Sequence, residues 1–287
     1  MSAAENAKRA KAAAKPASKA AEAPATTAEE SGPLRNQLFP IGVDVYPLDE
    51  ERQSFDSWYD RDFETEFAAI AGARIAMVRL FVSWKLFEPQ VGQYDADAED
   101  RLGDLLAAAR AHDLKAIVTF FADDRLAEMN ELPWAKKRDP RTDDYLIQRE
   151  ISLVQRVVNR FRSETAVWAW ELGNEAFFTG FTTEDALQKW AGALRDAIRE
   201  VDSARAIILA ADPETLVRET GVDARAAIDS FEYGVSHVTA PYRAYAAEGP
   251  LTYGPATYLD SFLLRASLRD IPVLFDGVGI HSLDFSV

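Results

Sequence analysis

Short apolar runs alternate with longer amphipathic stretches along most of this chain, and this alternation limits the possible folds more than any other feature. Seven runs are visible, each with the length and the β-branched content of a buried strand. Apolar character on both faces is typical of parallel strands that helices cover. The runs are Pro40–Tyr46, Met77–Trp84, Lys115–Phe121, Ala166–Leu172, Ala206–Ala211, Tyr233–Val238 and Ile271–Phe275.

The stretches between the runs place apolar residues at three- and four-residue intervals, which is the spacing of helices with one buried face. Repeated strand–helix–strand units give right-handed crossovers and a parallel sheet. Because no glycine-rich phosphate loop accompanies them, the pattern favours a closed barrel over a doubly wound sheet. The expected helices are Phe63–Ala71, Ala98–His112, Asp144–Phe161, Asp185–Val201 and Tyr258–Leu268.

The expected fold is therefore an α/β protein, a TIM-type (β/α)8 barrel assigned to residues 34–287. Seven strands rather than eight are visible, so we expect either an incomplete barrel or one that closes in an unusual way. Residues 1–33 are rich in Ala, Lys, Glu and Pro. Such a composition buries too little surface to offset the entropy of ordering, which predicts a disordered tail.

Composition excludes several kinds of partner and chemistry. The formal net charge of −15 argues against nucleic acid or an anionic membrane surface, because both would repel the chain. No apolar run approaches the roughly 18 residues of a membrane span, and the N-terminus lacks the apolar core of a secretory signal, so the default expectation is a cytoplasmic location. The chain has no cysteine, and its three histidines are scattered. Neither a metal nor another cofactor is therefore expected.

The strongest chemical signal is the segment WAWELGNE at residues 168–175. Catalytic groups of a parallel barrel lie at the carboxyl ends of its strands, and Asn174 and Glu175 fall where the fourth strand ends. A glycosidase needs a carboxylic acid there to protonate the leaving oxygen, and a neighbouring amide can bind a sugar hydroxyl. We therefore predict that Glu175 is the general acid/base and that Asn174 contacts substrate. The alternative is an Asn-Glu pair that merely begins a loop.

Four motifs in order resemble clan A of the glycoside hydrolases, nearest to family 5, the β-mannanase and cellulase type. They are FPIGVDVYP, ARIAMVRLFVSW, WELGNEAF and IPVLFDGVG, and the resemblance covers roughly Phe39 to Gly279. It implies a glycoside hydrolase that acts on β-linked sugars of the mannan or glucan type by a retaining two-carboxylate mechanism. It also implies that Arg79 lies under the nucleophile and holds it ionised, although an arginine within an apolar strand can instead form a structural ion pair.

The nucleophile of the family would align with Gly277, which has no side chain. Asp276 is adjacent, but strand side chains alternate between faces, so Asp276 can serve only if the strand is bulged or shifted by one residue. Two interpretations follow. The chain is either an active retaining glycosidase that uses Glu175 and Asp276, or a catalytically impaired relative that binds carbohydrate. A barrel enzyme of another reaction class is a third, weaker option.

Four further residues are expected to contact the sugar. His237 and Tyr242 lie where the resemblance implies a sixth-strand His-x-Tyr motif, although the spacing here departs from it. Trp84 and Trp134 belong to a set of aromatic residues near the expected strand ends, where rings stack on the apolar faces of pyranoses. The alternative in each case is an ordinary core or loop residue.

Overall fold

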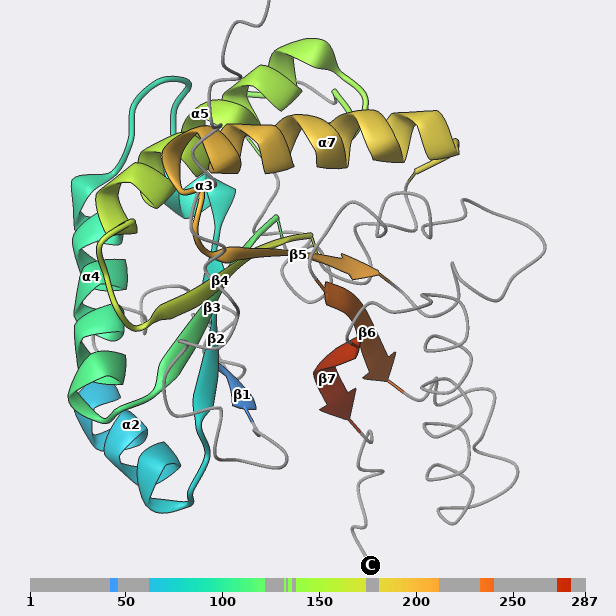
Figure 1. The fold of residues 1–287 in the computed structure, drawn as a ribbon. Helices are drawn as coiled ribbons and strands as arrows, with labels where there is room; N and C mark the ends of the chain where they lie inside the picture. The colour runs from blue at the N-terminus through green and yellow to red at the C-terminus, as the bar shows by residue number, and fades with distance from the viewer. Residues whose placement is uncertain are drawn as a thin grey trace, which may run out of the picture. The chain divides into compact units, whose positions relative to one another are not determined.

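Seven parallel strands form one sheet in chain order, β1-β2-β3-β4-β5-β6-β7 (Figure 1). This computed structural model describes residues 42–45, 62–121, 132, 134–135, 138–173, 181–211, 233–239 and 273–279, and from residue 210 onward it describes the backbone only. The strands are β1 Gly42–Val45, β2 Met77–Val82, β3 Lys115–Phe120, β4 Val167–Leu172, β5 Ala206–Ala211, β6 Tyr233–Thr239 and β7 Val273–Gly279. Parallel pairing in sequence order is the arrangement of a (β/α)8 barrel, and the expected fold class is confirmed.

The described helices connect these strands. They are α2 Phe63–Gly72, α3 Trp84–Phe87, α4 Ala96–Ala111, α5 Asp144–Phe161 and α7 Glu184–Val201. Four match the expected amphipathic stretches, whereas the expected helix at Tyr258–Leu268 and the expected tail at 1–33 lie outside the described residues. One prediction was wrong in detail: the run Met77–Trp84 does not remain extended to its end. Ser83 accepts a hydrogen bond from the backbone N–H of Leu86 and begins α3 at Trp84.

The longer helices begin at residues whose side-chain oxygens accept backbone N–H groups of the first turn. Asp95 caps α4, Asp143 caps α5 and Thr183 caps α7. Each cap satisfies donors that have no partner within the helix itself. These residues therefore fix where the chain turns from a loop into each covering helix.

Both faces of the central strands are buried. All six residues of β2 are buried, and alternate positions of the strand face the barrel interior and the helices. The helical side is filled by aliphatic and aromatic side chains without exposed surface, among them Phe67, Leu102, Leu153 and Trp190. α5 and α7 pack against each other over this layer (Figure 1). Burial of this apolar surface is the main force that holds the helices on the sheet.

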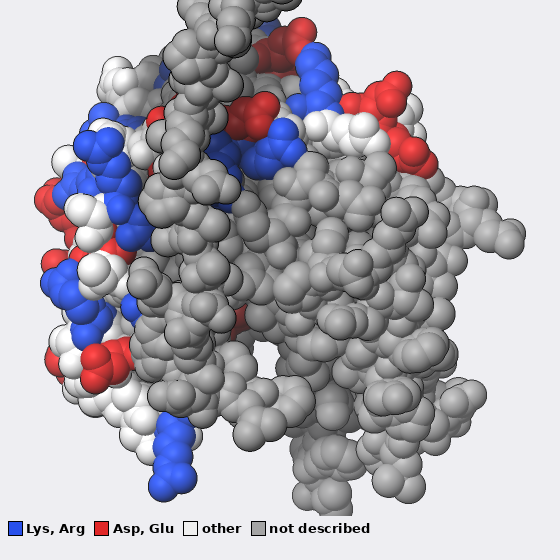
Figure 2. Space-filling view, viewed as in Figure 1, with Lys and Arg blue, Asp and Glu red and all other residues white. Residues whose placement is uncertain are grey.

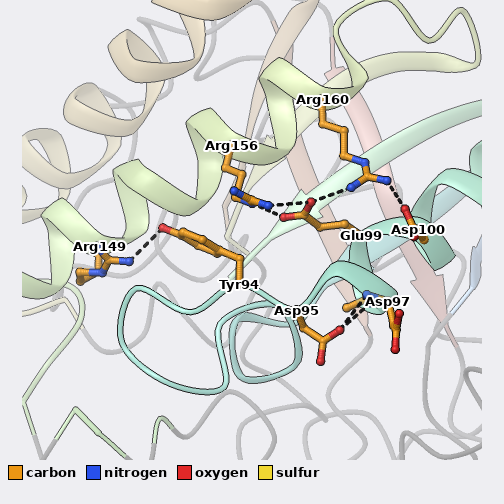
Figure 3. A network of polar contacts seen from close by, with 9 residues as sticks. Tyr94, Asp95, Asp97, Glu99, Asp100, Arg149, Arg156 and Arg160 are labelled. Carbon is orange, nitrogen blue, oxygen red and sulfur yellow. Dashed lines mark hydrogen bonds and ion pairs between the residues drawn. The ribbon is translucent and has the colours of Figure 1, made fainter.

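Polar side chains fasten α4 to α5 on the outside of the barrel. Arg156 and Arg160 of α5 both extend toward Glu99 of α4, which is buried, and Arg160 also reaches Asp100 (Figure 3). The guanidinium of Arg156 lies 4.7 Å from the ring centroid of Tyr94. Two arginines therefore compensate the charge of one desolvated carboxylate, which is the arrangement that a buried acid requires.

Acidic and basic side chains are interspersed over the described helices on the face that Figure 2 shows. Many of them form ion pairs, such as Lys189 with Asp144 and Arg110 with Glu164. Within the described ranges, no helix has the length and the apolar composition needed to cross a bilayer.

Candidate active site

The residues expected to carry chemistry come from the carboxyl-terminal parts of several strands, and the structure describes them to different depths. Side chains are described for Arg79 on β2, Trp84 at the start of α3 and Trp134. His237 on β6 and Asp276 on β7 are described as backbone only. Asn174, Glu175 and Tyr242 lie outside the described residues.

Arg79 lies in the barrel interior and is 3% exposed. Its Nε–H donates to Oε2 of Glu171 at 2.5 Å and to Oγ1 of Thr119 at 3.0 Å. The Thr119 hydroxyl donates to the same Glu171 oxygen at 2.5 Å, so three polar groups from three neighbouring strands form a closed triangle. The Nη1 atom of Arg79 also lies 3.8 Å from Oδ2 of Asp44 on β1. The guanidinium thus spans the interior from β4 to β1.

This cluster replaces apolar packing at the centre of the barrel. Thr119 and Glu171 have no exposed surface, and the Arg79 guanidinium carbon lies 4.9 Å from the centroid of the Phe81 ring. A guanidinium and a carboxylate in such a place are stable only as a hydrogen-bonded pair, because each alone would lose its hydration without compensation. The predicted ion-pair alternative for Arg79 and the predicted functional role are therefore compatible, since the paired guanidinium also lies next to the carboxylate of Asp44.

β7 pairs with β6 through an irregularity at Asp276. Ser236 pairs with Phe275, but the next residue of β6, His237, pairs with Gly277, so that Asp276 falls between two paired positions. One extra residue on one strand is the signature of a β-bulge, which locally resets the alternation of side chains and is frequent next to active sites. The strand also continues to Gly279, so Asp276 lies within the paired strand rather than after it.

The sheet register relates these positions to the Arg79 cluster. Thr119 pairs with Glu171, Glu171 with Ile208, and Ile208 with Tyr233. His237 follows Tyr233 by four residues, and Glu175 follows Glu171 by four residues in the sequence. Equal offsets from one row of paired residues are expected to bring side chains to a similar height in a parallel sheet. The positions of His237 and its partner Gly277 therefore lie about four residues beyond the Glu171 row, toward the carboxyl end.

Two backbone conformations distinguish the ends of β3 and β4. Gly173, directly before Asn174, has φ of +74° and donates its N–H to the carbonyl oxygen of Phe120 at 2.8 Å. Only glycine adopts this conformation without steric cost. Phe121 has φ of +60°, an unfavourable value for an aromatic residue that costs about 1–3 kcal/mol. Strain of this kind persists only where the surrounding packing imposes it, and it is concentrated at functional sites.

Aromatic rings impose the conformation of Phe121. Its ring packs edge-to-face on Trp84 with centroids 5.4 Å apart, and it also contacts Trp190 of α7. Trp84 in turn packs edge-to-face on Trp134 with centroids 5.7 Å apart. Trp84 is 3% exposed and lies in the core, which leaves almost no ring surface for a sugar. Of the two predicted aromatic contacts, half-buried Trp134 is the one with surface to offer.

Glu88 holds this aromatic cluster in place. Its carboxylate accepts hydrogen bonds from the indole N–H of Trp84 at 2.8 Å and from the backbone N–H of Gly92 at 2.7 Å, and it pairs with Arg149 of α5. Its backbone carbonyl accepts the indole N–H of Trp134 at 3.2 Å. One fully buried glutamate therefore fixes the orientation of both tryptophans.

Three of these residues were missed by sequence reasoning: Thr119, Glu171 and Glu88. A signal for Glu171 existed, because Arg79 and Glu171 are each a lone charge within an apolar strand, and lone buried charges seek each other. Glu88 sits in a polar loop and gives no such signal. No group of three or more His, Asp or Glu side chains suited to a metal ion occurs among the described residues.

The topology and the strand-end positions of these residues define a parallel barrel of the kind that carries its chemistry at the carboxyl ends of the strands. A family model described as Cellulase (glycosyl hydrolase family 5) matches residues 42–242, which is more than half of the 287 residues. The chain belongs to glycosyl hydrolase family 5, and the predicted resemblance is confirmed.

Two curated relatives match short parts of the chain. Mannan endo-1,4-beta-mannosidase A of Hypocrea jecorina is 31% identical over 96 residues, which cover 30% of this chain and 22% of that protein. Probable mannan endo-1,4-beta-mannosidase F of Aspergillus flavus is 31% identical over 110 residues, which cover 37% of this chain and 24% of that protein. The matches thus span about a quarter of the length of these relatives or less.

Solved structures share the fold. GH5_18 of Streptomyces cattleya in complex with Manβ1-4GlcNAc superposes with a TM-score of 0.70 at 18% identity, covering 82% of this chain and 61% of that one. The exo-beta-1,4-mannosidase Op5Man5 of Opitutaceae bacterium strain TAV5 superposes with a TM-score of 0.69 at 22% identity, covering 83% and 46%. At these identities the likeness establishes the barrel and nothing finer.

Proposed function

We propose that this chain acts as a retaining β-glycosidase, with β-1,4-linked mannosides as its substrate class. The observation that carries the proposal is the shift in the β6–β7 pairing at Asp276. A regular strand would turn Asp276 away from the side that Gly277 faces, and a bulge removes that objection. A carboxylate one residue before the usual position, and one methylene shorter, then becomes a feasible nucleophile.

The roles follow from the two-carboxylate mechanism. Asp276 attacks the anomeric carbon, while Glu175 donates its proton to the glycosidic oxygen, and the bond to the leaving sugar breaks. Glu175 then takes a proton from water, which attacks the glycosyl–Asp276 ester from the opposite face and releases the sugar with its original configuration. Arg79 stabilises the ionised nucleophile. Asn174, His237 and Tyr242 bind sugar hydroxyls, and Trp134 stacks on a sugar ring.

Mannosides are the preferred class because of the relatives. Both curated relatives described above are named as mannan endo-1,4-beta-mannosidases, and one structural neighbour is named an exo-beta-1,4-mannosidase. Another neighbour was solved with Manβ1-4GlcNAc bound, so its site accepts a β-1,4-linked mannoside. Carbohydrate is thus the partner that we infer for this chain.

A second function, carbohydrate binding without turnover, is favoured by one observation. Gly277, which pairs with His237, occupies the position of the family nucleophile and offers no oxygen. Stacking and hydroxyl binding need no nucleophile, so affinity for sugars can persist in a chain that does not hydrolyse them.

The test compares hydrolysis of 4-nitrophenyl β-mannoside and β-1,4-mannooligosaccharides by the full chain and by Glu175→Gln and Asp276→Asn. We expect each substitution to lower kcat/KM by about 10³-fold or more, because each removes an essential group. Asp104→Asn is the matched control, since Asp104 is an exposed carboxylate on α4, and it should leave the rate unchanged.

Added azide separates the two roles. In Glu175→Ala, azide should attack the glycosyl-enzyme in place of water and give the β-glycosyl azide. In Asp276→Ala, azide should occupy the vacated nucleophile position and give the α-glycosyl azide. Sugar binding by the wild type without hydrolysis, together with turnover gained in Gly277→Glu, would instead establish the binding function.

A further inference from the structure

The Arg79 side chain does not stay at the height of its own backbone. Arg79 pairs with Ile117 on β3, yet its Nε–H bonds to Thr119 and Glu171, which share a row with Phe81. That row lies two residues further along the strands, which is roughly 6.6 Å toward the carboxyl end at the usual rise per residue. The side chain therefore rises toward the end of the barrel where catalytic groups of this fold lie.

The contacts that hold it there use the inner nitrogen of the guanidinium. Arginine has five N–H donors, and only the one on Nε engages Thr119 and Glu171 in these bonds. The two acceptors are themselves linked, because the Thr119 hydroxyl donates to Glu171 Oε2. Fixing Nε against a linked pair of acceptors fixes the plane of the guanidinium. The terminal nitrogens, one of them near Asp44, are thereby oriented as well.

We propose that Thr119 and Glu171 are positioning residues, which set the height and the plane of Arg79 so that its terminal nitrogens stabilise the ionised nucleophile. The inference rests on the proposed glycosidase function. It assigns a role in catalysis to two residues that do not touch the reacting atoms and act only through Arg79.

Position matters because several charged groups share the one guanidinium. Asp44 on β1 and Glu171 on β4 are carboxylates that face Arg79. The strand register adds Asp276 on β7 and His237 on β6 as titratable positions further toward the carboxyl end. Electrostatic energy in a desolvated interior changes steeply with distance, so a small displacement of Arg79 would redistribute its stabilisation among these groups.

Thr119→Val is the most selective test, because valine keeps the shape of threonine and removes only the hydroxyl. Two readouts are taken: hydrogen exchange of the Arg79 Nε–H by NMR, and the acid limb of the pH profile of kcat/KM for 4-nitrophenyl β-mannoside. We expect exchange to accelerate about 10-fold or more and the acid limb to move upward by about half a pH unit or more. Thr119→Ser should restore both, and Thr142→Val, at an exposed threonine, should change neither.

A lower melting temperature of Thr119→Val with an unchanged acid limb and unchanged exchange would overturn the proposal and leave Thr119 a purely structural residue. If Thr119→Val does not fold, Glu171→Asp takes its place. It keeps the charge and draws the acceptor away by one methylene, so it should move the acid limb in the same direction, and no movement would contradict us.

The outcome is separable from that of the proposed function. If the wild type hydrolyses no β-glycoside, the glycosidase proposal fails on its own evidence. The exchange measurement then decides the positioning claim alone: protection of the Nε–H that persists in Thr119→Val overturns it, and protection lost in Thr119→Val but kept in Thr119→Ser supports it.

Discussion

Glu171 in the barrel interior and Glu150 in the helix layer are both fully buried, yet their surroundings differ in kind. Glu171 pairs with Arg79 and accepts the hydroxyl of Thr119. Glu150, on α5, accepts the indole N–H of Trp190 at 2.8 Å and makes no printed contact with a cation. Burial raises the pKa of Glu150 well above its ordinary value; the Trp190 bond and Arg141 oppose this, and Asp139 adds to it.

The difference separates two uses of a buried acid. A carboxylate that is matched by an arginine keeps its charge and can organise other charges around it. A carboxyl group that lies among apolar rings is held neutral and serves as a hydrogen-bond acceptor for Trp190. The barrel interior is therefore built to hold charge near the proposed nucleophile, whereas the α5–α7 interface is built to avoid charge.

Removal of Glu171 should produce the largest effect and tests whether the interior cluster is a matched pair. Glu171→Ala leaves the desolvated guanidinium of Arg79 without this carboxylate, and we expect the free energy of unfolding to fall by about 3–5 kcal/mol. Urea denaturation at pH 7 measures it. Asp104→Ala, at an exposed carboxylate, should cost no more than about 0.5 kcal/mol. Equal losses for the two variants would refute the matched pair.

Glu150→Gln should act in the opposite direction. Because the folded-state pKa of Glu150 is raised, the folded protein holds a proton that the unfolded chain releases as pH rises above about 4.5. The wild type therefore loses stability as pH climbs from there toward the folded-state pKa, and glutamine removes that loss. We expect Glu150→Gln to be more stable than the wild type by about 2 kcal/mol at pH 8 and similar to it at pH 4. Urea denaturation at both pH values decides, and a variant that is weaker at pH 8 would show that Glu150 is charged.

Asp202 extends the comparison to the amino-terminal ends of the strands. Burial pushes its pKa upward, but hydrogen bonds from Trp170, from Arg205 and from two backbone N–H groups outweigh burial, and the pKa lies below its ordinary value. Its contribution is thus present above about pH 4 and is lost as pH falls through the folded-state pKa. Asp202→Asn should cost about 1 kcal/mol at pH 7 and less at pH 3. A cost that is the same at both values, measured by urea denaturation, would mean that the charge of Asp202 contributes nothing.

Most of the scaffold could be predicted from the sequence, because buried strands and amphipathic helices leave periodic patterns that do not depend on distant residues. The seven strands and four of the helices show this. The start of α3 at Trp84 was missed, since an apolar tail of a strand and an apolar first turn look alike until the cap at Ser83 is recognised.

The candidate site was predicted less completely, and the reason is physical. Arg79 was identified because a charge in an apolar strand stands out, but its partners Thr119 and Glu171 come from other strands and depend on register. The pairing shift at Asp276 depends on β6 as much as on β7, so no local pattern in IPVLFDGVG could reveal it. Trp84 was expected in the sugar cleft, whereas Glu88 and Phe121 hold it in the core.

Covalent trapping tests the central claim most directly, that Asp276 is the nucleophile of a retaining glycosidase. An activated 2-deoxy-2-fluoro-β-mannoside with a good leaving group should glycosylate the enzyme faster than water releases the sugar, so the intermediate accumulates. Mass spectrometry of the intact chain, followed by peptide mapping, locates it. The account predicts one glycosyl adduct, carried by Asp276 and absent from Asp276→Asn. An adduct on another carboxylate, or no adduct on the wild type, would contradict it.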